Sequence, residues 1–256
     1  MALIDCDFFS DALEVGTSMT VVLPQATEGQ IGVRPGARRT DFPVLYLLHG
    51  LSDDHTAWLR YTSIERYAAA AGLAVVMPAV HRSFYSDEAH GHRYWTFISE
   101  ELPRIVGEFF RVSAEARNTF VAGLSMGGYG ALKLALSHPD RYGAVASLSG
   151  VTDVNALGGR LEHGELQPIW DGSIGPADDL FSLLSAVDSA SVPPLYLGSG
   201  TEEDLLLPDT ERFVAAARAK GLDVTTDFQP GVHEWGLWDR QIAEVIRWLP
   251  LAGDEA

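Results

Sequence analysis

Short, almost continuously apolar runs alternate with helical patterns along this chain, and this alternation constrains the fold more than any other feature. Runs such as 43–48 (PVLYLL) and 119–124 (TFVAGL) carry almost no polar residues, which is typical of strands covered on both faces of a parallel sheet. We expect strands at 18–23, 43–48, 73–77, 119–124, 143–148, 194–198 and 223–228. The alternation predicts an α/β fold with a mostly parallel, doubly wound sheet flanked by helices.

The segments between these runs have helical spacing. We expect helices at 94–110, 126–137, 208–220 and 236–249, with a kink or break at Pro103 in the first of them. Pro208 and Gly221 are the usual start and stop signals of the third. Residues 151–177 are irregular and Gly-rich, which favours a small cap over one edge of the sheet. Without repeats or long linkers, we predict a single domain over residues 1–256.

Charge and composition exclude several classes of function. Acidic residues outnumber basic ones 35 to 18, a formal charge of −17, so the surface should repel nucleic acids and anionic membranes. Cys6 is the single cysteine, and the N-terminus lacks the pattern of a signal peptide. The longest nearly apolar stretch, 68–80, is too short to span a membrane. We therefore expect a soluble cytoplasmic protein, and the sequence leaves a homo-oligomer open.

One strand-to-helix junction carries a candidate nucleophile. The segment 119–136 (TFVAGLSMGGYGALKLAL) contains the pattern G-x-S-x-G around Ser125. The pattern alone is weak, but here it stands between a buried strand and a buried helix, as the nucleophile elbow of α/β-hydrolases requires. Gly123 and Gly127 would let the strand and helix approach this sharp turn. The competing interpretation, a tight turn without chemistry, explains the glycines but not the hydroxyl.

A serine nucleophile needs a base, and in this fold the base follows last in the chain. Three histidines follow Ser125: His138, His163 and His233. His138 precedes a proline at the end of the elbow helix, and His163 lies in the irregular segment. His233 lies between the last strand and the last helix, where the base belongs, and we predict that it is the base.

The acid that orients the base should follow the strand at 194–198. The segment LGSGTEEDLLLPD offers four carboxylates, of which we choose Asp204, with Glu203 next. Asp153, just after the preceding strand, is a less favoured alternative. The others are interpreted as a solvated loop.

Backbone N–H groups are expected to stabilise the oxyanion. We predict one donor at Met126, directly after Ser125, and the other at Leu51, in the loop after the strand at 43–48. His49 precedes the nucleophile in the chain, so we expect it to shape this loop.

The longer motifs resemble a known family. The segments VLYLLHGLSDDHTAWLRYTSIERYAAAAGLAVVMP, SFYSDEAHGHRYWTFISEELP, VAGLSMGGYGALKLAL and GVHEWGLWDRQI are together similar to the tributyrin-esterase branch of the esterase D family. That family includes S-formylglutathione hydrolases, feruloyl and acetyl esterases, and mycolyltransferases. The resemblance covers roughly residues 5 to 250.

The resemblance implies an α/β-hydrolase fold and hydrolysis of short-chain acyl esters, acetyl to butyryl, without metal or organic cofactor. It implies the roles of Ser125, Asp204 and His233 as a catalytic triad, with Leu51 and Met126 as oxyanion donors. One departure is Leu51-Ser52-Asp53-Asp54, where S-formylglutathione hydrolases usually carry a cysteine. It disfavours a formylglutathione substrate.

Several bulky residues near the motifs are candidates for a narrow acyl pocket: Trp58, Tyr85, Trp95 and Trp235. The equally weighted alternative is that they pack in the core. Other functions remain as hypotheses: a thioesterase or acyltransferase with the same triad, and a catalytically inactive hydrolase-fold binding protein. A metal site at His81, His90 and His92 is disfavoured, because no carboxylate or cysteine cluster accompanies them.

Overall fold

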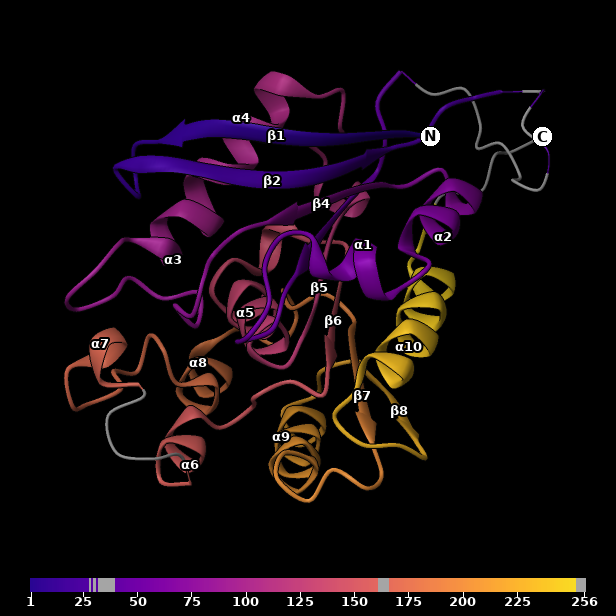
Figure 1. The fold of residues 1–256 in the computed structure, drawn as a ribbon. Coiled ribbons are helices and arrows are strands. Elements are labelled where there is room, and N and C mark those ends of the chain that lie inside the picture. The colour runs from indigo at the N-terminus through magenta and orange to yellow at the C-terminus, as the bar shows by residue number, and fades with distance from the viewer. Residues whose placement is uncertain (28, 30, 32–39, 161–165, 252–256) are drawn as a thin grey trace.

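Eight strands form one sheet in the order β1-β2-β4-β3-β5-β6-β7-β8 (Figure 1). The structure is a computed structural model and describes residues 1–27, 29, 31, 40–160 and 166–251. From β3 to β8 all neighbours are parallel, whereas β1 pairs antiparallel with β2, and β2 with β4. The strands are β1 (Ala2–Ser10), β2 (Val15–Leu23), β3 (Val44–Leu48), β4 (Ala74–Pro78), β5 (Thr119–Leu124), β6 (Ala144–Leu148), β7 (Leu195–Gly200) and β8 (Val224–Gln229).

Helices cover both faces of this sheet. On one face lie α1 (Ala57–Tyr61), α2 (Ile64–Ala71) and α10 (Trp235–Trp248). On the other lie α3 (Tyr94–Thr96), α4 (Leu102–Phe109), α5 (Met126–Ser137), α6 (Val154–Gly158), α7 (Gln167–Trp170), α8 (Leu180–Ala186) and α9 (Leu207–Ala219). Short turns are the 3₁₀-helices η2 (Ala116–Asn118) and η3 (Pro139–Arg141). The apolar runs of the sequence are the central strands, which are buried on both faces.

The first strand was missing from the prediction. Asp5 and Asp7 interrupt its apolar residues, and most of its side chains are exposed or half-buried because β1 lies at the edge of the sheet. Edge strands of this kind lack the continuous apolar signal that identifies the central ones. The seven predicted strands are all present, with ends shifted by at most three residues.

The predicted break near Pro103 is present in another form. The segment 94–110 consists of α3, a π-helical turn η1 (Phe97–Glu101) and α4, and Pro103 lies in the first turn of α4. Because α4 continues directly from η1, with the Leu102 N–H bonded to the Phe97 carbonyl, the proline follows a π-helical turn instead of starting a separate helix. Within η1, Glu101 is buried and accepts hydrogen bonds from the backbone of Asp11 and Ala12, so it fixes the β1–β2 turn.

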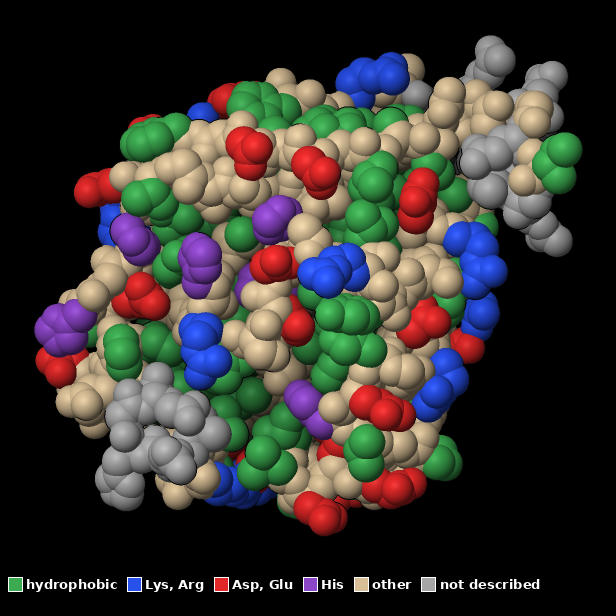
Figure 2. Space-filling model, in the orientation of Figure 1, with side chains coloured by type: hydrophobic (Ala, Val, Ile, Leu, Met, Phe, Trp, Pro, Cys, Tyr) green, Lys and Arg blue, Asp and Glu red, His purple; other side chains and the backbone are tan. Residues whose placement is uncertain are grey.

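The predicted cap at 151–177 contains the short helices α6 and α7, and residues 161–165 of it lie outside the described residues. No helix in the described part of the chain is long and apolar enough to cross a membrane. Acidic and basic side chains are interspersed over the face shown in Figure 2. Because β3 and β5 to β8 run parallel, the loops at their carboxyl ends meet at one edge of the sheet, where α/β proteins bind ligands.

Candidate active site

Ser125 stands at a sharp turn between β5 and α5. Its backbone angles are φ 54° and ψ −117°, a conformation that a residue with a side chain rarely adopts. The Ser125 N–H donates to the carbonyl of Leu148 on β6 at 2.9 Å, and the Ser125 carbonyl accepts from Val151 at 3.2 Å. These contacts over-determine the strained turn, as expected of a nucleophile elbow.

Two glycines make this turn possible by close approach of backbones. A Cβ at Gly123 would lie 2.3 Å from the carbonyl oxygen of Gly127, and one at Gly127 would lie 2.4 Å from that of Leu48. Backbone atoms cannot yield as a flexible side chain can. The glycines that flank the serine are therefore required by packing between β3, β5 and α5.

His233 lies in the loop between β8 and α10, where its imidazole faces a buried carboxylate. Its Nδ1 is 3.3 Å from Oε2 of Glu203, whose side chain is 2% exposed against 41% for His233. The edge of the Trp238 ring packs against the imidazole, with centroids 4.7 Å apart. The Glu203 carboxylate and the Trp238 ring thus hold the imidazole from two sides.

Glu203 is held as a carboxylate by its donors. Burial would raise its pKa, but the hydrogen bonds from His233 and Ser149, with the Gly200 N–H at 3.1 Å, outweigh burial and leave the pKa below its usual value. Ser149 itself accepts from the indole N–H of Trp238 at 3.0 Å. The carboxylate therefore stays ionised beside the imidazole at neutral pH.

This geometry corrects the predicted acid. Asp204 is exposed at the cavity mouth, and the carboxylate beside His233 is that of its neighbour Glu203, the second choice of the sequence analysis. The other alternative, Asp153, caps α6 through the Ala156 N–H and pairs with Arg212. The sequence alone could not show which of three consecutive acidic residues faces His233. The turn from Gly200 to Glu203 decides which of these side chains points inward.

The loop after β3 lies against the elbow. A Cβ at Gly50 would be 3.7 Å from Cβ of Ser125, so this loop borders Ser125. Buried His49 shapes it: Nδ1 donates to the Gly50 carbonyl at 2.7 Å, and Nε2 accepts from the Val80 N–H at 3.1 Å. Burial lowers the pKa of His49 to about 4, so the ring is neutral and structural. Leu51 and Met126 flank the site, and their roles as oxyanion donors stay a prediction.

A cavity of about 440 Å³ opens at these residues. Its described lining combines the catalytic candidates with aliphatic and acidic side chains and one aromatic ring, from the segments that follow β3 to β8: Leu51, Phe84, Ser125, Val151, Leu157, Glu202, Glu203, Asp204, Leu205, Leu206, Val232 and His233. Ser125 and His233, 108 positions apart in the chain, therefore meet at one cavity.

The four predicted pocket aromatics lie elsewhere, so this prediction was wrong. Trp58 is buried under the sheet, where its N–H donates to the Leu48 carbonyl and Trp235 packs on its ring. Tyr85 is fully buried behind the cavity, and Trp95 stacks on His138. Phe84 and the aliphatic residues form the wall instead. Helical spacing could not reveal this, because it does not say which layer a large side chain enters.

No group of three or more metal-ligating side chains exists among the described residues. His90 faces Asp171 at 3.4 Å on an exposed loop, and His163 falls outside the described residues.

Comparison with known proteins adds the family. The model of the family described as "Putative esterase" matches residues 12–249. The chain belongs to this esterase family. The esterase is 25% identical over 272 residues to the acetyl esterase of Caldicellulosiruptor saccharolyticus, a match that covers 99% of this chain and 100% of that one.

Solved structures agree with the family. The esterase resembles the substrate-bound fluorophosphonate-binding serine hydrolase F (FphF) of Staphylococcus aureus, with TM-score 0.86, 32% identity, and 97% and 98% of the two chains covered. The S-formylglutathione hydrolase FrmB of S. aureus gives TM-score 0.83, 32% identity and the same coverage. The chain is thus a carboxylic ester hydrolase of an esterase D-like family with the α/β-hydrolase fold.

Proposed function

We propose that this enzyme hydrolyses short-chain acyl esters, acetyl to butyryl, through an acyl-enzyme on Ser125. The observation that carries the proposal is the meeting of the strained Ser125, His233 and buried Glu203 at one cavity. A serine, an imidazole and an orienting carboxylate are the parts that nucleophilic acyl transfer needs.

In the proposed reaction, Nε2 of His233 takes the Ser125 proton as Oγ attacks the ester carbonyl. Glu203 holds Nδ1–H, fixes the tautomer and stabilises the imidazolium. The Leu51 and Met126 N–H groups hold the oxyanion. The carbon–oxygen bond to the alcohol breaks, and the alcohol leaves with the proton from His233. Water activated by His233 then attacks the acyl-enzyme, releases the acid and restores Ser125.

The size and lining of the cavity favour a short acyl chain. About 440 Å³ falls in the lower part of the range for ligand sites, and half of the described lining residues are leucine or valine. Leu157 from α6 and Leu206 before α9 contribute to this wall. We therefore expect the rate to fall for chains much longer than butyryl.

The charge of the lining bears on the competing thioesterase hypothesis. Glu202 and Asp204 line the cavity, and none of its described lining residues is a lysine or an arginine. A glutathione thioester carries net negative charge, so these carboxylates would oppose its binding. This favours an ester without net negative charge over an S-formylglutathione-type substrate. An acyltransferase would differ in the acceptor that reaches the acyl-enzyme, which product analysis with added alcohol would detect.

The test is the hydrolysis rate of p-nitrophenyl esters from acetate to decanoate, measured with Ser125→Ala in parallel. We expect a maximum at two to four carbons and a loss on the order of a million-fold in the variant. Similar weak rates for both proteins would contradict the assignment of the nucleophile. A maximum at eight or more carbons would contradict the short-chain specificity alone.

A further inference from the structure

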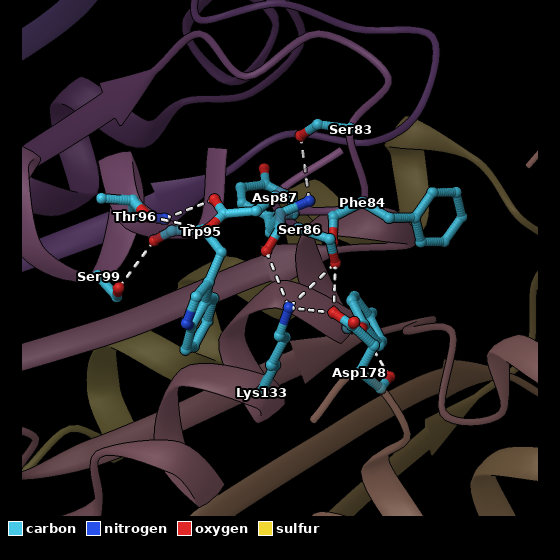
Figure 3. A network of polar contacts seen from close by, with 11 residues as sticks. Ser83, Phe84, Ser86, Asp87, Trp95, Thr96, Ser99, Lys133 and Asp178 are labelled. Carbon is cyan, nitrogen blue, oxygen red and sulfur yellow. Dashed lines mark hydrogen bonds and ion pairs between the residues drawn. The ribbon is translucent and has the colours of Figure 1, made fainter. Parts of the chain in front are cut away.

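A buried cation that the proposed mechanism does not use lies on the elbow helix. Lys133 is eight residues after Ser125 on α5, and its side chain is 3% exposed. Its Nζ donates to Oδ1 of Asp178 at 2.5 Å, to Oγ of Ser86 at 3.0 Å and to the carbonyl of Tyr85 at 3.2 Å (Figure 3). The Trp95 ring packs 4.3 Å from the ammonium. All three of its protons therefore have an acceptor.

A buried ion pair contributes little net stability, because desolvation of the two charges opposes their attraction. Its value lies in the geometry that its donors and acceptors impose. Here Asp178 extends the network: its Oδ1 accepts from Ser86, and its carbonyl accepts from the Tyr129 hydroxyl at 2.7 Å. Lys133 and Tyr129 both belong to α5, so one helix holds the segment around Ser86 and the loop before α8 together.

The segment that Lys133 holds is a strained turn. Phe84 and Tyr85 are consecutive residues with left-handed backbone, at φ 49° and 51°. Aromatic residues rarely adopt this conformation, and a pair in succession needs support from its surroundings. Lys133 stabilises the turn directly, by donating hydrogen bonds to the Tyr85 carbonyl and the Ser86 hydroxyl.

The same turn reaches the active site at two points. The Phe84 ring points away from Lys133 and lines the catalytic cavity (Figure 3). The Tyr85 hydroxyl donates to the His49 carbonyl at 2.9 Å, immediately before the Gly50–Leu51 loop. The Tyr85 ring also packs closely against α5, since a Cβ at Gly130 would be 2.6 Å from it.

We propose that Lys133 is a positioning residue that braces the oxyanion loop against the nucleophile through Tyr85. Ser125 lies at the start of helix α5, and Lys133 lies further along the same helix. The Lys133 ammonium fixes the Phe84–Tyr85 turn, and the Tyr85 hydroxyl of that turn donates to the His49 carbonyl. The distance between Ser125 and the Leu51 N–H is thereby set by a single rigid helix. This role rests on the proposed function, because it concerns the oxyanion loop of that reaction.

The test compares Lys133→Met, which keeps the length of the side chain without its charge, with Tyr85→Phe, which removes only the hydroxyl. Lys220→Met is the control, because Lys220 lies at the C-terminal end of α9 and its side chain makes a solvent-exposed hydrogen bond, to the Ser185 carbonyl. For each variant, kcat and KM for p-nitrophenyl butyrate are normalised to sites titrated with a fluorophosphonate. Inhibition by a trifluoromethyl ketone, which forms an oxyanion on the serine, is measured beside them, with Tm.

We expect Lys133→Met and Tyr85→Phe each to lower kcat about ten- to a hundredfold, with KM changed less than about threefold, since misplacing an oxyanion donor costs less than removing it. Ketone affinity should fall in parallel, and the double variant should lose little more than either single one. Lys220→Met should keep wild-type values.

A wild-type kcat per titrated site in Tyr85→Phe would overturn the proposal, whatever the stability of Lys133→Met. So would a Lys133→Met protein that loses only Tm. Should Lys133→Met not fold, Tyr85→Phe decides alone, because it leaves the ammonium and its partners intact. Failure of the proposed function is distinguishable: wild-type activity would then be absent, or would survive in Ser125→Ala.

Discussion

The two sides of the catalytic cavity are built differently. On one side, the elbow, the His49 loop and the Phe84–Tyr85 turn are buried and tied by hydrogen bonds to the sheet and to α5. On the other side, the segment 202–206 mixes buried and exposed residues, and the residues of the loop around His233 are exposed or half-buried. The first side holds Ser125 and the loop beside it within the sheet, whereas the second supplies His233 and Glu203 together with exposed side chains at the cavity. We infer that both sides contribute to the chemistry and that the exposed residues of the second side set the choice of ester.

The comparison is tested most sharply by two neighbouring carboxylates of the segment 202–206, since Glu203 is buried and Asp204 is exposed. Glu203→Gln should lower kcat about 10³–10⁴-fold, because the imidazole loses the carboxylate that fixes its tautomer. The matched change Asp204→Asn should lower kcat less than about tenfold. Steady-state kinetics on p-nitrophenyl butyrate would check both. A larger loss in Asp204→Asn than in Glu203→Gln would contradict the assignment of the acid.

The buried side makes a prediction about stability and pH. The folded-state pKa of His49 is about 4, below the 6.5 of an unfolded histidine. Between these values the unfolded chain binds a proton that the folded chain does not, so stability falls as the pH falls from 6.5 to 4. The loss is on the order of 3 kcal/mol. The free energy of unfolding, measured by urea titration between pH 6.5 and pH 4, should show this loss in the wild type and not in His49→Gln. The exposed His90→Gln is the control, and identical pH profiles for all three proteins would contradict a buried neutral His49.

The exposed side makes a prediction about charge. Glu202 and Asp204 line the cavity mouth, so the ratio of kcat/KM for a cationic ester to that for its uncharged carbon isostere should exceed one. Acetylcholine and 3,3-dimethylbutyl acetate are such a pair. In Glu202→Gln/Asp204→Asn the ratio should fall several-fold, and added salt should reduce it in the wild type. The same two changes at Glu100 and Asp223, away from the cavity, should leave the ratio intact. An unchanged ratio in the first double variant would show that the rim does not select by charge.

The smallest effect is expected where the cap meets α9. Arg160 donates to Asp209 at 2.6 Å and to the Leu205 carbonyl at 2.8 Å, but it is partly exposed, and Arg212 also pairs with Asp209. Arg160→Gln should therefore lower the free energy of unfolding by less than about 1 kcal/mol. Denaturant titration measures this, and a loss above about 2 kcal/mol would show that the cap contributes more to folding than its contacts indicate.

Sequence reasoning was strongest on the buried side. Apolar runs and the glycines around Ser125 predicted the central strands and the elbow, because burial on both faces and backbone contact leave few residue types possible. It also placed His233 in the correct loop from chain order. A role for His49 in shaping its loop was predicted too, and the hydrogen bonds of its ring agree.

It failed where tertiary contact decides. The choice between Glu203 and Asp204 depends on a turn that begins at Gly200, and the edge strand β1 has no continuous apolar pattern. Trp58 and Tyr85 were assigned to the pocket because they are large and near the motifs, yet their polar atoms bind backbone carbonyls behind it. The expected cytoplasmic location and any oligomeric state stay predictions.

The most direct test of the central claim is to map the acyl-enzyme. The protein is incubated with a fluorophosphonate or rapidly quenched with p-nitrophenyl butyrate, digested, and analysed by mass spectrometry. The proposed reaction predicts one adduct, on Ser125, which is absent in Ser125→Ala and forms far more slowly in His233→Ala and Glu203→Gln. An adduct on another residue, or one that persists in Ser125→Ala, would contradict it.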